Sequence, residues 1–262
     1  VEVAVCGGAP KNSYELAEKA KQFKPALQTC GRIKITDKNP TWKIETMPAP
    51  RVMGDMLVLP TGDLLIINGA KSGCSGWEFA EDPNLNPVLY RPTKAMEQRF
   101  EELEASEIPR MYHSTSAVLP DGKILVAGSS THNGYKFDVK YPTELRVEKF
   151  SPPYLDPQLA VYKPTIETNF AGQELRYGNK FSLEITLNGY EVVDADLKVT
   201  MYSPAFTTHG YSMNQRLIVL ATSKVSRLMG RTYQLTVTAP PNGAVAPPGY
   251  YMLFVVNRGV PS

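Results

Sequence analysis

A repeated pair of strands joined by a Pro-x-Gly turn is the feature that most limits how this chain can fold. Residues 51–70 read Arg-Val-Met-Gly-Asp-Met-Leu-Val-Leu-Pro-Thr-Gly-Asp-Leu-Leu-Ile-Ile-Asn-Gly-Ala. Residues 110–130 repeat the order of an Arg, an apolar run, a Leu-Pro-x-Gly turn and a second apolar run. Glycine at such a turn supplies the positive φ that a tight connection needs. Each copy is therefore predicted to be a β-hairpin.

A further short strand follows each hairpin after a variable loop, at residues 87–90 and 144–150. The opening run 3–8 resembles the second strand of an earlier unit, and the runs 32–35 and 42–45 resemble its later strands. Units of about four short antiparallel strands, repeated roughly every 50–60 residues, are typical of β-propeller blades. We therefore expect residues 1–155 to be a partial kelch-type β-propeller of about two to three blades. The alternative is a stack of unrelated hairpins, because a closed ring needs about four to eight blades.

A different pattern begins after a proline-rich boundary at positions 152, 153, 157 and 164. Short strands with period-2 alternation and Gly, Pro or Asn turns are typical of an immunoglobulin-like β-sandwich. Residues 156–262 are predicted to be such a domain, so the whole chain is assigned to the all-β class. One helix is predicted over 13–23, with Ser13 as its N-cap, as an excursion between two strands. The strand runs after the boundary are 180–187, 196–202, 217–220, 232–237 and 250–256.

Composition excludes several classes of partner. The 28 Lys and Arg residues nearly balance the 26 Asp and Glu residues, for a net charge of +2. This balance gives no reason to expect nucleic acid or an anionic membrane as partner. No apolar run approaches the ~20 residues of a membrane-spanning helix. The chain begins at Val1 in a strand-like run, so we expect it to be part of a longer protein.

Three histidines are the main candidates for chemistry, because the nucleophile-elbow, zinc-protease and phosphate-loop motifs are absent from the sequence. His113 follows Tyr112 at the start of a predicted strand. His209 lies in a Thr-Thr-His-Gly loop between strands of the C-terminal domain, and His132 lies in another loop. An isolated histidine or tyrosine is more often structural or merely exposed than a ligand, and that interpretation stays open for each of them.

Several segments resemble the radical copper oxidases of the galactose oxidase/glyoxal oxidase family, in order along nearly the whole chain. The segments that resemble the family as a whole are Pro109–Ser114 with Leu119–Gly122, Ser203–Gly210 with Asn214–Arg216, and Pro248–Asn257 with Gly259–Ser262. Two further segments, Cys6–Pro10 and Phe150–Leu155, are more similar to the glyoxal oxidase branch.

The resemblance implies one copper ion on the propeller axis. His113 and His209 would be its nitrogen ligands, and Tyr112 would be its axial phenolate and the catalytic base. Adjacent strand residues point to opposite faces, so Tyr112 and His113 can share a metal only at a strand end or bend. His209 would have to reach into the ring from the C-terminal domain.

In this family the second cofactor is a tyrosyl radical cross-linked to a cysteine. These residues are expected upstream of this chain, and the role is not assigned to Cys74, which is interpreted as a free or externally paired thiol. Cys6 and Cys30 flank an excursion between two strands and are able to form a disulfide, although the sequence alone does not settle the pairing. Trp77 and His132 are candidates for residues around the copper site that the sequence cannot place.

The function implied is that of the C-terminal part of a secreted enzyme that oxidises small aldehydes to carboxylic acids with O2, producing H2O2. Without the radical half, this chain alone is expected to be inactive. One alternative is a primary-alcohol or galactose-type oxidase. Another is a non-catalytic propeller and sandwich module that binds glycan or protein, in which the histidines are bystanders.

Overall fold

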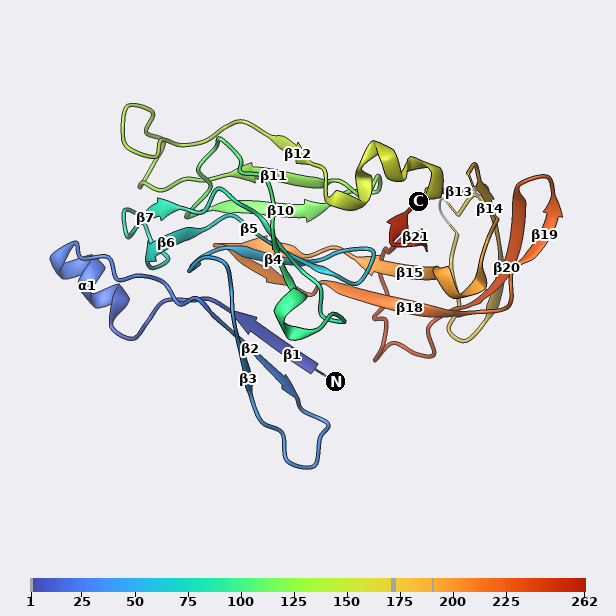
Figure 1. The fold of residues 1–262 in the computed structure, drawn as a ribbon. Helices are drawn as coiled ribbons and strands as arrows, with labels where there is room; N and C mark the ends of the chain where they lie inside the picture. Colours follow the sequence, from blue (N-terminus) through green and yellow to red (C-terminus); the bar gives the residue numbers. More distant parts are fainter. Residues whose placement is uncertain (1, 171–172, 190) are drawn as a thin grey trace.

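The computed structural model describes residues 2–170, 173–189 and 191–262. Val1, predicted at the start of the opening strand, lies outside these residues. Over the described part the fold is all-β apart from helix α1 (Ser13–Ala20) and four 3₁₀ turns (Figure 1). These turns are η1 (Met96–Gln98), η2 (Pro153–Leu155), η3 (Pro157–Tyr162) and η4 (Asp194–Asp196). No helix among the described residues is long and apolar enough to cross a membrane.

Three small antiparallel sheets form the N-terminal part. The first contains β1 (Glu2–Cys6), β2 (Thr29–Lys34) and β3 (Lys43–Thr46), in that order. The second has the order β4 (Asp55–Val58), β5 (Leu64–Ile67), β8 (Val88–Tyr90), β9 (Phe100–Glu102), with a side ribbon of β6 (Ala70–Gly73) and β7 (Ala80–Pro83). The third has the order β10 (Ser114–Val118), β11 (Ile124–Gly128), β12 (Glu148–Phe150).

The two predicted hairpins are confirmed as β4–β5 and β10–β11. Gly62 and Gly122 adopt φ values of 95° and 79° in their turns. This is the left-handed region that glycine adopts without steric cost. Phe100–Glu102, within an acidic run, pairs with β8 as β9. The strand predicted over 144–150 is shortened to Glu148–Phe150.

The predicted helix over 13–23 is shorter than expected. Lys21 has a φ of 51°, which ends α1 at Ala20 without a glycine. The N-cap position belongs to Asn12, not Ser13. The Ser13 hydroxyl instead donates to the carbonyl oxygen of Pro10, at 2.7 Å. The excursion between two strands is thus confirmed, but its helical bounds and cap were wrong.

The C-terminal part is one larger sheet together with a separate two-stranded ribbon. Leu183, Ile185 and Leu187 alternate inward along β14, as the period-2 pattern predicts. The ribbon pairs β16 (Phe206–Thr208) with β17 (Tyr211–Met213). The large sheet has the order β13 (Pro164–Ile166), β14 (Lys180–Leu187), β20 (Thr232–Thr238), β18 (Arg216–Thr222), β15 (Leu197–Ser203), β21 (Met252–Asn257) and β22 (Val260–Pro261), with β19 (Ser226–Met229) on β20.

The second and third N-terminal sheets share one apolar cluster with the C-terminal sheet. Leu57, Leu65 and Val126 of the second and third sheets cluster with Tyr202 of β15 and Phe254 of β21. All five side chains are buried. The two hairpins therefore bury one face against β15 and β21. Since β15 leads directly into β16, this packing holds the start of the β16–β17 ribbon against the N-terminal sheets.

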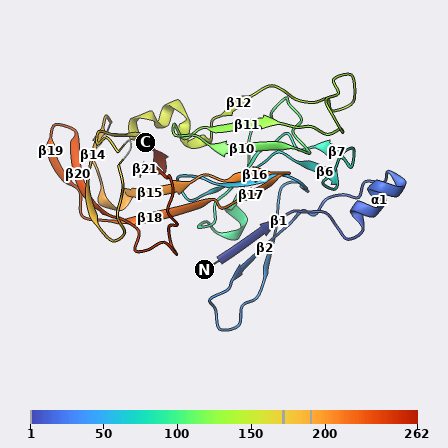
Figure 2. The same cartoon turned by 180° about the vertical axis from the view of Figure 1, so that it is seen from behind.

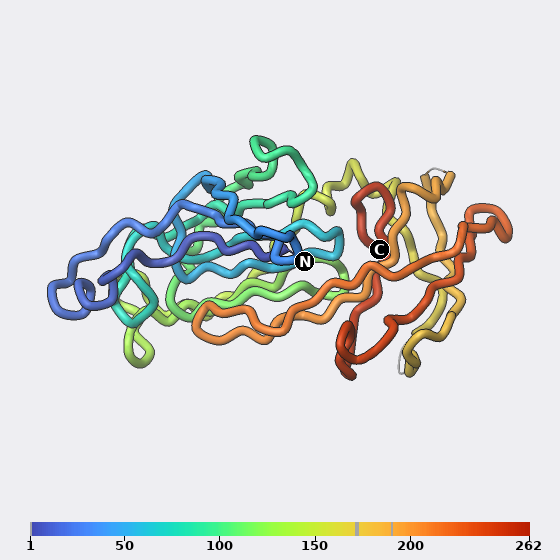
Figure 3. The backbone as a smooth tube through the Cα atoms, turned by 90° about the horizontal axis from the view of Figure 1, so that it is seen from below, coloured from blue at the N-terminus to red at the C-terminus, as the bar shows by residue number. Residues whose placement is uncertain are grey.

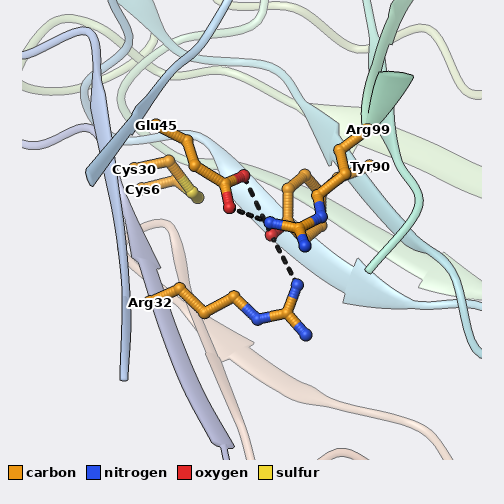
Figure 4. Close-up of a disulfide and its surroundings, with 6 residues drawn as sticks. All are labelled: Cys6, Cys30, Arg32, Glu45, Tyr90 and Arg99. Atoms are coloured by element: carbon orange, nitrogen blue, oxygen red, sulfur yellow. Dashed lines mark hydrogen bonds and ion pairs between the residues drawn. A yellow bond between two sulfur atoms is a disulfide. The ribbon is translucent and has the colours of Figure 1, made fainter. Parts of the chain in front are cut away.

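A disulfide joins Cys6 of β1 to Cys30 of β2, which are directly opposite each other in the strand register (Figure 4). Next to it, Glu45 of β3 forms a buried ion pair with Arg99 and accepts a hydrogen bond from the Tyr90 hydroxyl at 3.2 Å. The pairing that the sequence left open is thus present, and the neighbouring ion pair fastens the first sheet to the second.

Candidate metal centre

Tyr112 and His113 lie immediately before β10, at the entry to the strand. His113 has a φ of 132°, and its backbone N–H donates to the Met111 carbonyl at 2.7 Å. This bend breaks the strand alternation that would send adjacent side chains to opposite faces. The two rings consequently stack, with their centroids 4.4 Å apart and their planes 23° apart.

His209 lies at the turn of the β16–β17 hairpin rather than in a long open loop. His209 and Gly210 have φ values of 54° and 80°, and Thr208 pairs with Tyr211 across the turn. Two consecutive positive φ values are the geometry of a type I′ hairpin, whose twist matches that of the flanking strands. The hairpin extends from the C-terminal sheet along the N-terminal sheets (Figures 2 and 3).

This hairpin brings His209 to the Tyr112–His113 pair. The ring centroids of His113 and His209 are 4.6 Å apart, and those of Tyr112 and His209 are 6.0 Å apart. The Thr208 hydroxyl lies 2.7 Å from Nδ1 of His209. The three residues singled out in the sequence therefore converge, although they come from separate parts of the chain.

His113 is electrostatically suited to remain neutral. Burial, and secondarily the neighbouring His209, lowers the pKa of His113 below its usual value. Within the described part of the chain, Nε2 of His113 is buried without a hydrogen-bond partner. The unprotonated nitrogen of a neutral imidazole carries a lone pair that can bind a metal ion or a proton.

The donor set is two imidazoles and a phenol, without a carboxylate. No group of three His, Cys, Asp or Glu side chains suited to a metal occurs among the described residues. Imidazole nitrogens suit Zn, Cu, Fe and Ni. His113, His209 and Tyr112 are therefore the residues that could hold a transition-metal ion here.

Of the other sequence candidates, Trp77 lies at this site and His132 does not join the cluster. The Trp77 and Tyr112 rings meet edge to face, with centroids 6.3 Å apart. His132 instead contacts Glu78 through Nδ1 at 2.8 Å and the Lys140 carbonyl through Nε2 at 3.1 Å. Cys74 is a buried free thiol whose pKa is raised by burial.

A cavity of about 190 Å³ borders Tyr112 on the side of these loops. Its lining includes Phe79, Met111 and Tyr141 together with His132. The pocket has room for a small molecule beside Tyr112, but neither His113 nor His209 lines it.

Sequence reasoning missed the residues that hold the His209 hairpin in place. The Gln215 side chain accepts from the Val58 N–H at 2.8 Å and donates to the Met56 carbonyl at 2.7 Å. Ser212 donates to the buried Asp55 at 3.1 Å. These contacts join residues more than 150 positions apart, so local patterns carried no signal for them.

The chain matches two family models, "Glyoxal oxidase N-terminus" over residues 1–154 and "Galactose oxidase-like, Early set domain" over residues 163–262. It is 52% identical over 261 residues to aldehyde oxidase GLOX1 of Arabidopsis thaliana, covering all of this chain and 42% of the relative. It is 44% identical to aldehyde oxidase GLOX of Vitis pseudoreticulata, covering 99% of this chain and 48% of the relative. The chain therefore spans less than half the length of these curated relatives.

Among solved structures, the chain resembles a fungal alcohol oxidase of the AA5 family in complex with copper. The TM-score is 0.72 at 22% sequence identity, with 99% of this chain and 50% of that chain covered. At this level of identity the likeness establishes the shared fold.

Proposed function

The chain belongs to the glyoxal oxidase family of galactose oxidase-like proteins, and on that premise we propose that it is the C-terminal part of a secreted copper radical oxidase that oxidises small aldehydes. One observation carries the proposal, namely the convergence of His113, His209 and Tyr112 around an unpartnered buried imidazole nitrogen. The names of the relatives, aldehyde oxidases, favour aldehydes over alcohols.

Copper fits this donor set. His113 Nε2 lacks a partner, and His209 presents the second imidazole from the turn of a rigidly docked hairpin. Tyr112 would provide the phenolate oxygen. Copper, when bound, would accept one of the two electrons of the oxidation and lower the pKa of a coordinated substrate hydroxyl.

The work of this chain's own residues is to hold the ion and to move a proton. Tyr112 would accept the hydroxyl proton of the aldehyde hydrate at its phenolate oxygen, as a general base. The Trp77 and Tyr112 rings meet edge to face, and the pocket that Tyr112 helps to line would be the approach for the substrate. Overall the hydrate gives up two hydrogen atoms to O2, yielding a carboxylic acid and H2O2.

The second one-electron oxidant would be a Cys–Tyr radical cofactor in a preceding part of the parent protein. Cys74 is not proposed for this role. Since the chain spans 42–48% of the aldehyde oxidase relatives, there is ample sequence in such proteins to supply that pair. We therefore expect residues 1–262 alone to be catalytically inactive.

We also propose that the three N-terminal sheets, residues 1–155, are blades of a kelch-type ring, and that residues 156–262 form an immunoglobulin-like sandwich. Exposed apolar side chains on the first sheet and on the hairpin support further blades in the parent. Val5 and Ile44 are 56% and 58% exposed, and Phe206 and Tyr211 beside His209 are 69% and 65% exposed. Apolar residues on such faces are normally covered.

Secretion is supported by the Cys6–Cys30 disulfide, because disulfides persist in oxidising compartments. The expected partners of the parent enzyme are O2 and a small aldehyde, and the near balance of charge gives no reason to add nucleic acid or a membrane.

The decisive experiment measures Cu(II) stoichiometry and electron paramagnetic resonance in the intact protein, with His209→Ala compared against His132→Ala. We expect one copper per wild-type molecule with nitrogen hyperfine structure, and loss of this copper in His209→Ala with an unchanged circular dichroism spectrum. His132→Ala, the matched control, should bind copper normally. Full copper binding by His209→Ala would overturn the assignment. H2O2 production from glyoxal rather than galactose would then establish the substrate class.

A further inference from the structure

Asp55 is a buried carboxylate at the junction of three strands that the proposed reaction does not use. It begins β4 and is 1% exposed. Its Oδ2 accepts from the Ser116 hydroxyl of β10 at 2.8 Å and from Nδ2 of Asn68 at 3.4 Å. Its Oδ1 accepts from the Ser212 hydroxyl of β17 at 3.1 Å. Within the described residues these partners are all neutral.

Burying a carboxylate without a cationic partner is costly, and an apolar residue would fill the same place without that cost. Hydrogen bonds to an ionised acceptor are stronger and more directional than those between neutral groups. A carboxylate here therefore suits a site where relative position matters more than stability.

The two serines lead directly to the metal-site histidines. Ser116 is on β10, whose first residue follows His113, and Ser212 is on β17, whose first residue follows the His209–Gly210 turn. β4 contacts both β10 and β17. Asp55 thus ties together the two segments that must meet.

β16 of the hairpin also contacts β10 directly, but the other side-chain hydrogen bonds that fix the hairpin go to β4. Gln215 fastens the hairpin base to the β4 backbone. Gly210 packs against the Met53 carbonyl so closely that an added Cβ would lie 3.0 Å from its oxygen. These two contacts fix the hairpin to β4 and to the Met53 carbonyl just before it, whereas Asp55 also hydrogen-bonds Ser116 of β10.

We propose that Asp55 is a positioning residue for the metal centre, which sets the separation of His113 and His209 by accepting hydrogen bonds from Ser116 and Ser212 at once. The inference rests on the proposed function of the two histidines. If the inference is correct, removal of the Asp55 carboxylate loosens the β16–β17 hairpin even in metal-free protein.

The test compares Asp55→Ala, Asp55→Asn and Ser212→Ala with Glu45→Gln in the intact protein. Glu45 is the matched control, a buried acid that is ion-paired to Arg99 in the first sheet. The first readout is amide hydrogen exchange of residues 206–213 in metal-free protein. We expect exchange roughly 10-fold or more faster in Asp55→Ala, as when a hydrogen bond to a charged group is lost. Exchange should be unchanged in Glu45→Gln.

The second readout is Cu(II) affinity with the resonance spectrum. Outer contacts to metal ligands typically alter affinity about 10- to 100-fold, and we expect a loss in that range for Asp55→Ala with altered nitrogen hyperfine structure. Asp55→Asn, which retains one acceptor oxygen, should lose less.

If Asp55→Ala does not fold, Ser212→Ala, which removes one hydroxyl, decides the question. Unchanged hairpin exchange in the variants, or an equal change in Glu45→Gln, would overturn the inference. Absence of copper at His113 and His209 in the wild type would instead overturn the proposed function, and the metal-free exchange would still decide the role of Asp55.

Discussion

Replacement of Tyr202 by phenylalanine should stabilise the protein, because its hydroxyl is buried without a partner. Tyr202 lies on β15, just before the chain enters the His209 hairpin, and it is 0% exposed in the core shared by the N-terminal and C-terminal sheets. Within the described residues its hydroxyl makes no hydrogen bond. The neighbouring Tyr154 differs, since its hydroxyl donates to the Gly122 carbonyl at 2.5 Å.

The magnitude follows from these environments. An unsatisfied buried polar group costs about 1–3 kcal/mol. The cavity left by one oxygen atom costs only a few tenths of a kcal/mol, at ~24 cal/mol per Å³. Tyr202→Phe should therefore raise the free energy of unfolding by about 1 kcal/mol and the Tm by about 2–4 °C. Tyr154→Phe should lower the free energy of unfolding by about 1 kcal/mol through the lost hydrogen bond.

Urea and thermal unfolding of the two variants, followed by circular dichroism, measure the difference. The opposite signs are the critical result, because both substitutions remove the same group from the same cluster. A Tyr202→Phe variant destabilised as much as Tyr154→Phe would refute the assignment of an unpartnered hydroxyl, and with it the packing described between the sheets.

Three further predictions concern the disulfide, the histidine pair and the hairpin turn. Cys6→Ser with Cys30→Ser should lower the free energy of unfolding by about 3 kcal/mol, from the 24-residue separation that the bond closes, as chemical denaturation will measure. The folded pKa of His113 lies below its unfolded value near 6.5, so its contribution to stability is present above pH 6.5 and is lost as pH falls through the folded pKa. Unfolding of metal-free His113→Gln across pH 5–7.5 should show a flatter dependence than wild type, and an identical slope would contradict this reasoning. Gly210→Val places a side chain at a φ of 80° against the Met53 carbonyl; it should cost about 1–3 kcal/mol and weaken Cu(II) binding, whereas wild-type stability and affinity would contradict the turn geometry.

Strong local patterns made much of the fold predictable. The Pro-x-Gly turns located the β4–β5 and β10–β11 hairpins, and period-2 alternation located β14 at its observed bounds. Strands of three or four residues, such as β6, β7, β9 and β16, are too short to show a period. The early end of α1 at Lys21 could not be predicted, because no glycine marks its left-handed cap.

The site was accessible from the sequence only in part. Tyr112, His113 and His209 were singled out by family resemblance, and the structure brings all three together. Asp55 gave no signal, since a lone Asp at a strand start is ordinary in sequence, and Gln215 lay in a segment that resembles the family without any indication of its contacts. Their importance lies in contacts across the fold, which local propensity does not encode.

The shared core and the hairpin docked on β4 have a consequence for biosynthesis. Domains fold as the chain leaves the ribosome, N-terminal segments first, so His113 is synthesised well before the hairpin that brings His209 to it. Contacts between such distant segments form slowly, because the intervening loop must first be closed. The two imidazoles thus meet only after translation has passed β17, so a metal ion that needs both of them is acquired after that point.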